Sequence, residues 1–351
     1  MIELIFYCRP GFENDTAGEL MHRLAESGLG GYVKTDQQSG FVRLCGTSPV
    51  KPQAYCTAMP FHSLIFPRQR FIKCFEITDM ASEDRISPIL EAVSKVGPVT
   101  EMWQEYPDTN DGKSISRLTK KLEKPLLKLF KQKRVFSSDA HQRLHLFWLS
   151  GQHVIGGVSL TDNSAPWEMG YPRLRFPGGA PSRSTLKLEE AWLQLLTPGE
   201  RANLLKPGFR AVDLGAAPGG WTWQLVNKGM TVLAIDNGPM SPDLMATGKV
   251  THLTEDAFSY RPERVYDWLV CDIVDKPSRV MELMIRWICG RGCKYAMFNL
   301  KLPMKKRWAT VEELLAKLAD EIGETDLNRD IRAKQLYHDR DEITVFVGPS
   351  H

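Results

Sequence analysis

The sequence predicts an α/β protein whose C-terminal half is a doubly wound, mostly parallel sheet and whose N-terminal half belongs to the α+β class. Strand-like and helix-like segments alternate from residue 211 to residue 347, as they do in doubly wound sheets. A glycine-rich turn follows the first apolar strand of that alternation. The first 160 residues instead contain short strands and helices in irregular order. At 351 residues the chain exceeds one ordinary domain, so two or three domains are expected.

The composition is that of a globular protein, with 42% hydrophobic and 25% charged residues. No apolar run approaches the roughly 18 residues that a membrane-spanning helix needs. The N-terminal MIELIFYC carries an acid, and it has neither a basic segment nor a small-residue cleavage site. We therefore expect a cytoplasmic protein that has no membrane partner.

Cysteine and histidine spacing does not predict a metal site. The seven cysteines are scattered, and the one close pair, Cys289 and Cys293, lacks a neighbouring histidine or second pair. His141, His145 and His153 lie on or beside two expected strands, where residues four apart are separated by roughly 13 Å. That distance is too long for one ion, so the histidines are interpreted as ordinary surface or sheet residues. The scattered cysteines are interpreted as reduced thiols.

The N-terminal half begins with a small β-α-β-β unit. Residues 3–8 alternate like a strand, Asn14 or Asp15 can cap a helix, and Gly28 ends that helix. Two strands about a turn at 37–40 complete the unit at about residue 50. The segments that follow are expected as a strand at 70–77, a helix at 88–96, a strand at 99–106, a basic helix, and strands at 143–149 and 153–159.

The basic residues of the N-terminal half concentrate in one segment. Residues 113–134 contain a single acid, Glu123, so the segment carries +8 and the rest of the chain −5. A helical stretch of that charge favours contacts with phosphates, although a solvated helix face is the alternative. The candidate RNA-binding residues are Lys113, Arg117, Lys120, Lys121, Lys124, Lys128, Lys131, Lys133 and Arg134.

Residues 161–181 are predicted to link the two halves, because the stretch contains four prolines and three glycines. Its aromatic residues, Trp167, Tyr171 and Phe176, either contact RNA together with nearby arginines or pin the linker to a domain. The sequence leaves both possibilities open. A helix is expected directly after the linker, from Ser182 to Leu196.

The C-terminal half alternates between strands and helices. The expected elements are strand 211–215, helix 221–227, strands 231–236, 252–254 and 268–272, helix 279–288, strand 295–300, helix 311–322, and strands 331–337 and 342–347. This order is typical of a doubly wound sheet, in which ligands bind at the carboxyl ends of the strands.

The glycine-rich turn indicates a nucleotide-like cofactor. In AVDLGAAPGGWT (211–222), Gly215, Gly219 and Gly220 let the backbone turn sharply beside a ligand. A dinucleotide fingerprint requires Gly-x-Gly-x-x-Gly, whereas this turn places Ala217 at the second glycine position and adds a proline. S-adenosylmethionine is therefore favoured over NAD, and a strand-turn-helix without a ligand is the remaining alternative.

Three aspartates follow the turn at or just after the ends of expected strands: Asp236, Asp256 and Asp272. A ribose edge needs a bidentate acceptor and an adenine amino group needs a further acceptor, and Asp236 and Asp256 are placed to provide them. Asp272 is followed by Ile-Val-Asp rather than by the Pro-Pro-aromatic sequence that holds a planar nitrogen. The chain also contains no Pro-Cys or Thr-Cys for a cysteine nucleophile. An oxygen is therefore the expected methyl acceptor.

Two lysines and a further acid are expected near these aspartates. Lys187 lies on the helix that opens the C-terminal half, Lys301 directly follows an apolar strand, and Glu342 begins the last strand. A ribose hydroxyl is a weak acid whose proton must pass to a base, and an ordinary lysine, with a pKa of about 10.4, is protonated at neutral pH. We expect Lys187 to favour the neutral form of Lys301 by like-charge repulsion, and Asp272 and Glu342 to oppose this effect, with the balance left open.

These residues resemble a known family of enzymes. DLGAAPGGWT together with Lys187, Asp272, Lys301 and Glu342 is similar to the FtsJ-like 2'-O-ribose RNA methyltransferases and their Lys-Asp-Lys-Glu tetrad. The segments PSRSTLKLEEAW, IDNGPM, VCDIVDKP, FNLKLPMKKRW and QLYHDRDEITV resemble more closely the RlmM family, bacterial methyltransferases of a 23S ribosomal RNA cytidine. This similarity spans residues 182–347. The N-terminal half resembles the ferredoxin-like and THUMP domains of that family more weakly.

The resemblance implies a domain layout and a cofactor site. It implies a ferredoxin-like domain at 1–55, a THUMP-like RNA-binding domain at 56–160, the linker at 161–181 and a Rossmann-like methyltransferase domain at 182–351. Ala217 stands where the most similar ribosomal enzymes have cysteine, although alanine is usual in the wider FtsJ-like group. The residues implied to contact S-adenosylmethionine are Ser184, Gly215, Ala217, Pro218, Gly219, Gly220, Trp221, Asp236, Asp256 and Asp272, and Lys301 is implied as the proton acceptor.

The expected reaction is methyl transfer from S-adenosylmethionine to the ribose 2'-hydroxyl of a cytidine in 23S ribosomal RNA. We expect a monomer that acts on RNA free of ribosomal proteins and recognises it by shape and single-stranded presentation. The alternatives are 2'-O-methylation of another RNA, such as tRNA, and a catalytically idle RNA-binding assembly factor that keeps the fold. The intact tetrad favours an enzyme over the idle factor.

Overall fold

The computed structural model describes residues 2–350 and divides into two compact units, Met1–Tyr171 and Pro172–His351. Each unit is built on one seven-stranded sheet with helices packed on it, so the expected α/β fold class is confirmed. The division falls within the stretch that was expected to link two halves. None of the helices between residues 2 and 350 combines the length and the apolar character that a bilayer crossing needs.

The N-terminal unit contains one mixed sheet. Its strands, in the order in which they lie side by side, are β2 (Gly31–Thr35), β3 (Phe41–Gly46), β1 (Ile2–Tyr7), β4 (Gln69–Ile77), β7 (His153–Leu160), β6 (Gln142–Ser150) and β5 (Met102–Glu105). Neighbours are antiparallel except for β5 and β6. Because β1 pairs with both β3 and β4, the expected ferredoxin-like and THUMP-like parts share this sheet. The boundary between them stays a prediction.

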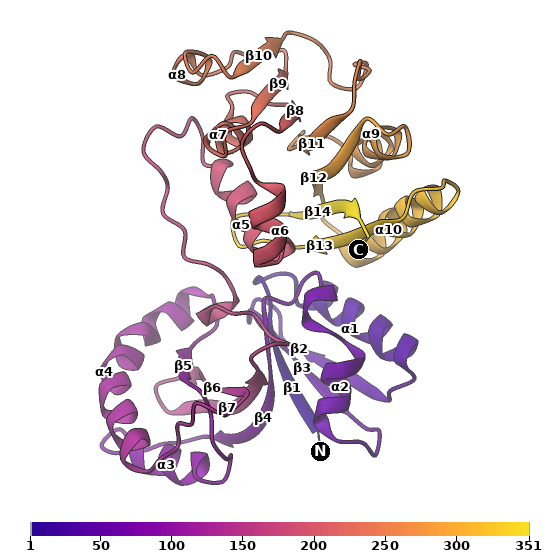
Figure 1. Ribbon diagram of the computed structural model, residues 1–351. Coiled ribbons are helices and arrows are strands. Elements are labelled where there is room, and N and C mark those ends of the chain that lie inside the picture. The colour runs from indigo at the N-terminus through magenta and orange to yellow at the C-terminus, as the bar shows by residue number, and fades with distance from the viewer. Residues whose placement is uncertain (1, 351) are drawn as a thin grey trace. The chain divides into compact units, whose positions relative to one another are not determined.

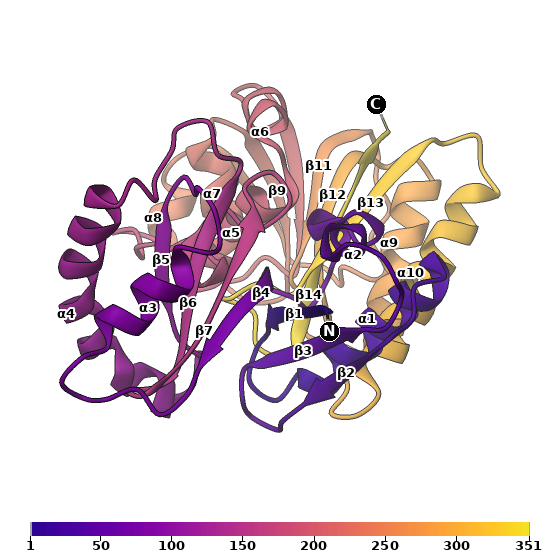
Figure 2. The ribbon, with the colours of Figure 1, turned by 90° about the horizontal axis from the view of Figure 1, so that it is seen from below.

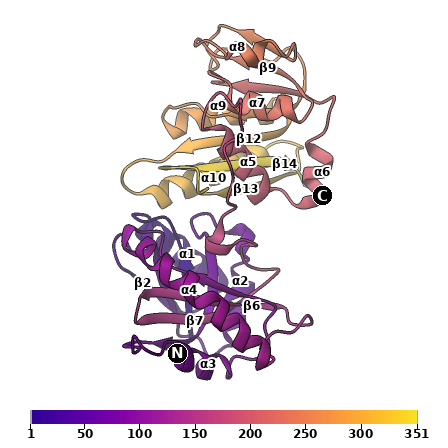
Figure 3. The same ribbon diagram turned by 90° about the vertical axis from the view of Figure 1, so that its left-hand side faces the viewer.

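The helices of this unit cover one face of the sheet. They are α1 (Glu13–Ser27), α2 (Pro52–Ala58), α3 (Ile86–Val93) and α4 (Asn110–Gln132). The first two pack on β1–β3 and the other two on β4–β6 (Figure 1). Alternate residues such as Leu4 and Phe6 contact α1 and α2, and Leu144 and Trp148 contact α3 and α4. The basic segment forms α4, which continues through Pro125 and is seen lengthwise in Figure 3.

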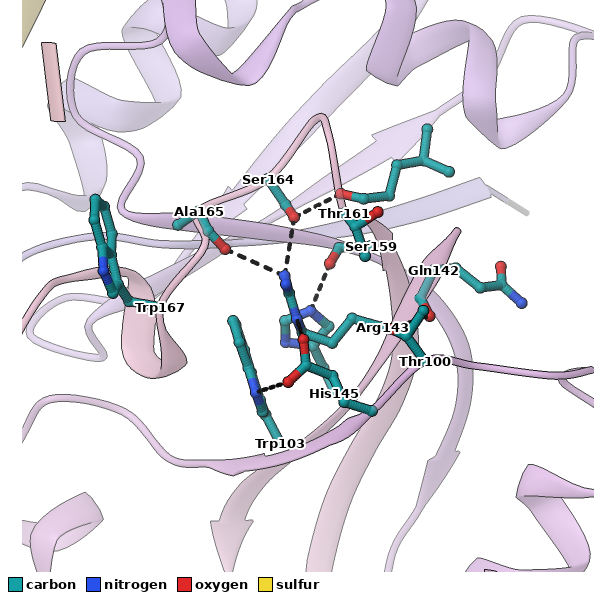
Figure 4. A network of polar contacts seen from close by, with 12 residues as sticks. Thr100, Trp103, Gln142, Arg143, His145, Ser159, Thr161, Ser164, Ala165 and Trp167 are labelled. Carbon is teal, nitrogen blue, oxygen red and sulfur yellow. Dashed lines mark hydrogen bonds and ion pairs between the residues drawn. The ribbon is translucent and has the colours of Figure 1, made fainter. Parts of the chain in front are cut away.

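The first part of the expected linker is packed against the opposite face of this sheet. Arg143 donates to the Ser164 hydroxyl and to the Ala165 carbonyl oxygen, at 3.3 and 3.2 Å (Figure 4). The backbone N–H of Met169 donates to the buried carboxylate of Glu105 at 2.7 Å. These bonds tie residues 164–169 to β5 and β6, so this part of the stretch belongs to the N-terminal unit.

The histidines considered for a metal site are held separately. His145 is buried between Glu105 and Ser159, with its Nδ1 2.6 Å from the carboxylate and its Nε2 2.8 Å from the hydroxyl. His153 contacts Glu76 at 2.8 Å. Within residues 2–350, no three histidine, cysteine or acidic side chains are grouped so that they could hold one metal ion.

The C-terminal unit is a doubly wound sheet. Its strands lie in the order β10 (Val250–Leu253), β9 (Thr231–Ile235), β8 (Arg210–Leu214), β11 (Tyr266–Cys271), β12 (Cys293–Lys301), β14 (Glu342–Pro349) and β13 (Arg329–Lys334). Neighbours from β10 to β12 are parallel, whereas β14 is antiparallel to both of its neighbours. The strand order reverses between β8 and β11, and sheets of this kind bind ligands at the carboxyl ends of the strands beside such a point.

Helices cover both faces of this sheet. They are α5 (Thr185–Leu195), α6 (Pro198–Leu204), α7 (Gly220–Asn227), α8 (Pro242–Met245), α9 (Pro277–Cys289) and α10 (Arg307–Gly323). Figure 2 shows α5 and α7 on one side of the central strands and α9 and α10 on the other. Trp192 of α5 and Leu225 of α7 pack in one core with Trp268 of β11 and Phe346 of β14.

Three short helices, α2, α6 and α8, were not expected from the sequence. Each has a proline in its first turn, where the missing N–H is not needed. In α6 the Thr197 hydroxyl accepts from the Glu200 N–H, and the Glu200 carboxylate accepts from the Thr197 N–H. Helices of four to seven residues contain too little apolar periodicity to be recognised from sequence.

Candidate active site

The glycine-rich turn connects β8 to α7 in a conformation that needs its glycines. Gly215 and Gly219 have φ angles of 73° and 113°, in the left-handed region that side chains rarely adopt. A Cβ atom on Gly220 would lie 2.2 Å from the Ser184 hydroxyl oxygen and 2.4 Å from that of Ser182. The turn therefore packs directly on the residues that precede α5.

The expected cofactor residues gather around this turn. Asp236, after β9, accepts hydrogen bonds from the backbone N–H of Ala217 at 2.9 Å and of Gly238 at 2.7 Å. Trp221 Nε1 donates to the Ser184 carbonyl oxygen at 3.0 Å. Asp236 is thus fixed against the turn, while each of its oxygens keeps a further acceptor position.

Asp256 lies in an exposed loop after β10 and accepts from the N–H of Phe258 at 2.9 Å. This bond shapes the turn that the loop makes. Pro218 lies exposed in the glycine-rich turn, next to the half-buried Ala217. The assignment of Asp256 and Pro218 to the cofactor stays a prediction.

The four tetrad residues come together from four elements. Lys187 is in the first turn of α5, Asp272 follows β11, Lys301 ends β12 and Glu342 begins β14. Lys187 Nζ lies 3.2 Å from Asp272 Oδ2 and also pairs with Glu342 Oε1. Lys301 Nζ lies 3.0 Å from Glu342 Oε2. The buried carboxylate of Glu342 therefore joins the two ammonium groups.

The charges of this cluster shift the pKa values of its members. Burial alone would lower the pKa of Lys187, but Asp272 and Glu342 outweigh it, so the pKa lies above its ordinary value. Burial would raise the pKa of Glu342, but the two ammonium groups outweigh it, so the pKa is lowered. For Asp272, burial and the charge of Glu342 outweigh Lys187 and raise the pKa. Lys187 is therefore held as a cation.

The two lysines differ in access. The side chain of Lys187 is 16% exposed and contacts two carboxylates, whereas that of Lys301 is 37% exposed and contacts one. Lys301 is therefore the more accessible of the two lysines, and Lys187 is the one held between two carboxylates.

A second layer of polar residues behind the tetrad was missed from sequence. Asn299 Nδ2 donates to Asp272 Oδ1 at 2.9 Å, and the Thr344 hydroxyl donates to Asn299 Oδ1 at 2.6 Å. The same hydroxyl lies 3.1 Å from Asp339 Oδ2, and burial raises the pKa of Asp339 well above its ordinary value. The signal available in the sequence was a polar asparagine inside the apolar run before Lys301.

A buried carboxyl group also lies beneath the turn. Asp213 is the fourth residue of β8, and its Oδ2 accepts from the Thr222 hydroxyl at 2.6 Å. Burial raises the pKa of Asp213 to about 7. This group links β8 to α7 and so supports the turn from below.

The candidate RNA-binding residues lie on α4 and directly after it. All nine basic side chains are exposed. Lys113 lies 3.4 Å from Asp108, and the other eight are free of ion pairs with residues 2–350. Leu126 and Phe130 bury the opposite side of the helix in the core. The arrangement leaves a continuous cationic surface on the N-terminal unit.

Three family models match the chain in order. Residues 1–71 match the RlmM ferredoxin-like domain, residues 84–160 match ribosomal RNA large subunit methyltransferase M, N-terminal, and residues 180–287 match the FtsJ-like methyltransferase. Solved structures that are similar include TrmN from Thermus thermophilus, with 13% identity, all of both chains covered and a TM-score of 0.36. The fibrillarin pre-rRNA processing protein of Methanococcus jannaschii has 15% identity and a TM-score of 0.34, over 48% of this chain and 76% of that one.

Two relatives align along nearly the whole chain. The ribosomal RNA large subunit methyltransferase M of Cellvibrio japonicus is 44% identical over 347 residues, which are 99% of each chain. The protein of the same name from Chromohalobacter salexigens is 46% identical over 347 residues, 98% of this chain and 97% of its own. Because both relatives align with nearly the whole chain at 44% and 46% identity, this chain belongs to the ribosomal RNA large subunit methyltransferase M family, RlmM.

Proposed function

We propose that this protein transfers the methyl group of S-adenosylmethionine to the ribose 2'-hydroxyl of a cytidine in 23S ribosomal RNA. The observation that carries the proposal is the buried carboxylate of Glu342, which joins Lys187 and Lys301 at the carboxyl edge of the sheet. Membership of the RlmM family supports ribosomal RNA as the substrate, and the FtsJ-like match supports the methyl donor.

The residues around the glycine-rich turn fit an adenosyl cofactor. When bound, this cofactor supplies a methyl group that is already activated on a sulfonium sulfur. Asp236 would accept hydrogen bonds from the ribose hydroxyls, since two backbone N–H groups fix its carboxylate and each oxygen keeps an acceptor position. Gly220 lets the turn pack directly against Ser182 and Ser184, which fixes the backbone of the turn beside Asp236.

The protein has two tasks in this reaction: to align the acceptor oxygen and to remove its proton. Lys301 Nζ is the proposed proton acceptor, because it ends β12 at the site and is the more accessible lysine. Glu342 pairs with both Lys187 and Lys301, and the contact at 3.0 Å orients Lys301 Nζ at the site. Asp272 lies beside these groups and is held by Lys187 and Asn299.

Methyl transfer to protein-free 23S ribosomal RNA tests the proposal. With radiolabelled S-adenosylmethionine, digestion of the product to nucleosides should give labelled 2'-O-methylcytidine. Label on a base would contradict ribose chemistry, and a preference for tRNA would support the alternative substrate. Absence of label with every RNA, despite cofactor binding, would support the idle RNA-binding factor.

We also propose that the cationic surface of α4 holds the RNA through its phosphates. Replacing Lys120, Lys121 and Lys124 by glutamate should weaken RNA binding and flatten its dependence on salt, because fewer counterions are released on binding. Cofactor affinity, measured by calorimetry, serves as the control and should not change. If RNA binding is unaltered, α4 is a solvated helix face and does not bind the RNA phosphates.

The protein is further proposed to act as a monomer in the cytoplasm, on RNA that carries no ribosomal proteins. Light scattering after size exclusion should then give one species of 39.8 kDa. Assembled large subunits should be poorer methyl acceptors than protein-free RNA. A dimer mass, or faster methylation of assembled subunits, would contradict this part of the proposal.

A further inference from the structure

Two apolar side chains near the tetrad are exposed far more than any other large apolar residue in the part of the chain that the structure describes. Val274 is 76% exposed and Met304 is 91% exposed, whereas the remaining five such residues lie between 38% and 51%. Val274 follows Asp272 by two residues, and Met304 follows Lys301 by three. Single exposed apolar residues are common, but two of this exposure beside one site indicate a contact surface.

The fold places the two loops that carry these residues side by side. The loops are residues 272–276 and 302–306, and they follow β11 and β12, which are adjacent and parallel. Adjacent parallel strands lie about 4.8 Å apart and end at the same edge of the sheet. Both loops therefore begin at the edge on which the tetrad lies.

Close contacts hold the start of each loop against the site. A Cβ on Gly215 would lie 2.5 Å from Ile273 Cγ1, so the first loop packs on the glycine-rich turn. The N–H of Leu302 donates to the carbonyl oxygen of Asp341 at 2.7 Å, which ties the second loop to the residue before Glu342.

The same loops carry exposed cations. Lys276 lies in the first loop and Lys305 and Lys306 lie in the second, and all three are exposed. Both acids of the first loop are paired: Asp272 with Lys187 at 3.2 Å, and Asp275 with Arg279 at 2.7 Å. Each loop therefore presents an apolar side chain beside positive charge. Positive charge holds the backbone of a single strand, and apolar side chains can pack against a base that lies outside a duplex.

We propose that loops 272–276 and 302–306 form an acceptor clamp. Val274 and Met304 contact the base and sugar of one unpaired target nucleotide, and Lys276, Lys305 and Lys306 bind the phosphates that flank it. This inference rests on the proposed function and adds the residues that hold the unpaired target nucleotide. Apolar contacts do not read the hydrogen-bonding edge of a base, so the clamp recognises the unpaired state of the nucleotide and not the identity of its base. The clamp also orients the 2'-hydroxyl toward Lys301.

A double variant with a matched control tests the apolar contacts. Val274→Ala with Met304→Ala should lower kcat/KM for 23S ribosomal RNA by roughly tenfold or more, mainly through KM, as the loss of apolar contacts in a binding site does. The control combines Val265→Ala and Met21→Ala; Val265 precedes β11 at its opposite end, and Met21 lies on α1. Calorimetry with S-adenosylhomocysteine should give the same affinity for both variants and the wild type. Equal kcat/KM in the variant and the control would overturn the clamp.

A second pair of variants tests the cations. Lys305→Gln with Lys306→Gln should reduce the slope of log affinity for RNA against log salt by about 1.4, since each phosphate contact to a single strand contributes about 0.7. The control is Lys206→Gln with Lys249→Gln, two exposed lysines that precede β8 and β10 at the amino ends of the strands. Equal slopes would overturn the phosphate contacts. If the wild-type protein transfers no methyl group, both the proposed function and the clamp are overturned. If the wild-type protein is active and the variants are unaffected, the clamp alone is overturned.

Discussion

Replacement of Glu342 by glutamine is expected to destabilise the C-terminal unit by about 3 kcal/mol, because it removes the charge that joins the two lysines. The carboxylate is 2% exposed, lies 3.0 Å from Lys301 Nζ and also pairs with Lys187. Breaking a buried ion pair costs roughly 3–5 kcal/mol. The lower end of that range is expected here, since the amide oxygen of glutamine still accepts a hydrogen bond and Asp272 still contacts Lys187.

The loss should depend on pH in a defined direction. Burial would raise the pKa of Glu342, but the two ammonium groups outweigh it and hold the pKa below the ordinary value of 4.5. A carboxyl group of this kind stabilises the fold above its unfolded-state pKa, and the stabilisation is lost as the pH falls through the folded-state pKa. The stability difference between wild type and Glu342→Gln should therefore be full at neutral pH and shrink below about pH 4.5.

Urea unfolding followed by tryptophan fluorescence measures this difference. The transition that S-adenosylmethionine moves to higher urea reports on the C-terminal unit. Glu282→Gln is the matched control, because Glu282 is exposed, lies 3.4 Å from Lys317 and should contribute less than about 1 kcal/mol. The reasoning would be refuted if Glu342→Gln unfolded at the same urea concentration as Glu282→Gln at neutral pH.

Three further substitutions test the cofactor site and the layer behind the tetrad. Asp236→Ala should weaken S-adenosylmethionine binding by roughly 1.5–3 kcal/mol in calorimetry, and an unchanged dissociation constant would show that this carboxylate does not bind the ribose. Gly220→Ala should also weaken binding, because the new Cβ displaces the serines that precede α5, while Gly199→Ala, which meets open space, should bind normally. Thr344→Val leaves Asn299 Oδ1 without its donor, so unfolding free energy should fall by roughly 1–3 kcal/mol and turnover should decrease. If Thr344→Val turns over at the wild-type rate, this layer has no role in positioning Asp272.

The central features of the C-terminal unit could be predicted because their signals are local. The glycine-rich turn needs residues that adopt positive φ, and the sequence 215–220 shows them directly. Parallel strands of a doubly wound sheet end at one edge, so the residues after such strands can be placed together without knowing their contacts. Asp272 and Lys301 are of this kind, and the structure brings them to the same edge.

The second polar layer could not be predicted because it depends on long-range register. In the antiparallel pair of β12 and β14, Lys301 lies opposite Glu342 and Asn299 lies opposite Thr344. These partners are more than 40 residues apart in sequence, and a shift of one residue would point them to opposite faces. The shared sheet of the N-terminal unit escaped prediction for the same reason, since it depends on the pairing of β1 with β4.

The most direct test of the proposed mechanism is the turnover of Lys301→Arg between pH 6 and pH 9. Arginine keeps the positive charge and can still donate to Glu342, but it stays protonated throughout this range and cannot accept the proton of the 2'-hydroxyl. If Lys301 is the proton acceptor, the variant should bind S-adenosylmethionine normally and should not methylate 23S ribosomal RNA at any of these pH values. Near-normal turnover across the range would contradict proton acceptance by Lys301 and leave it a purely electrostatic or positioning role.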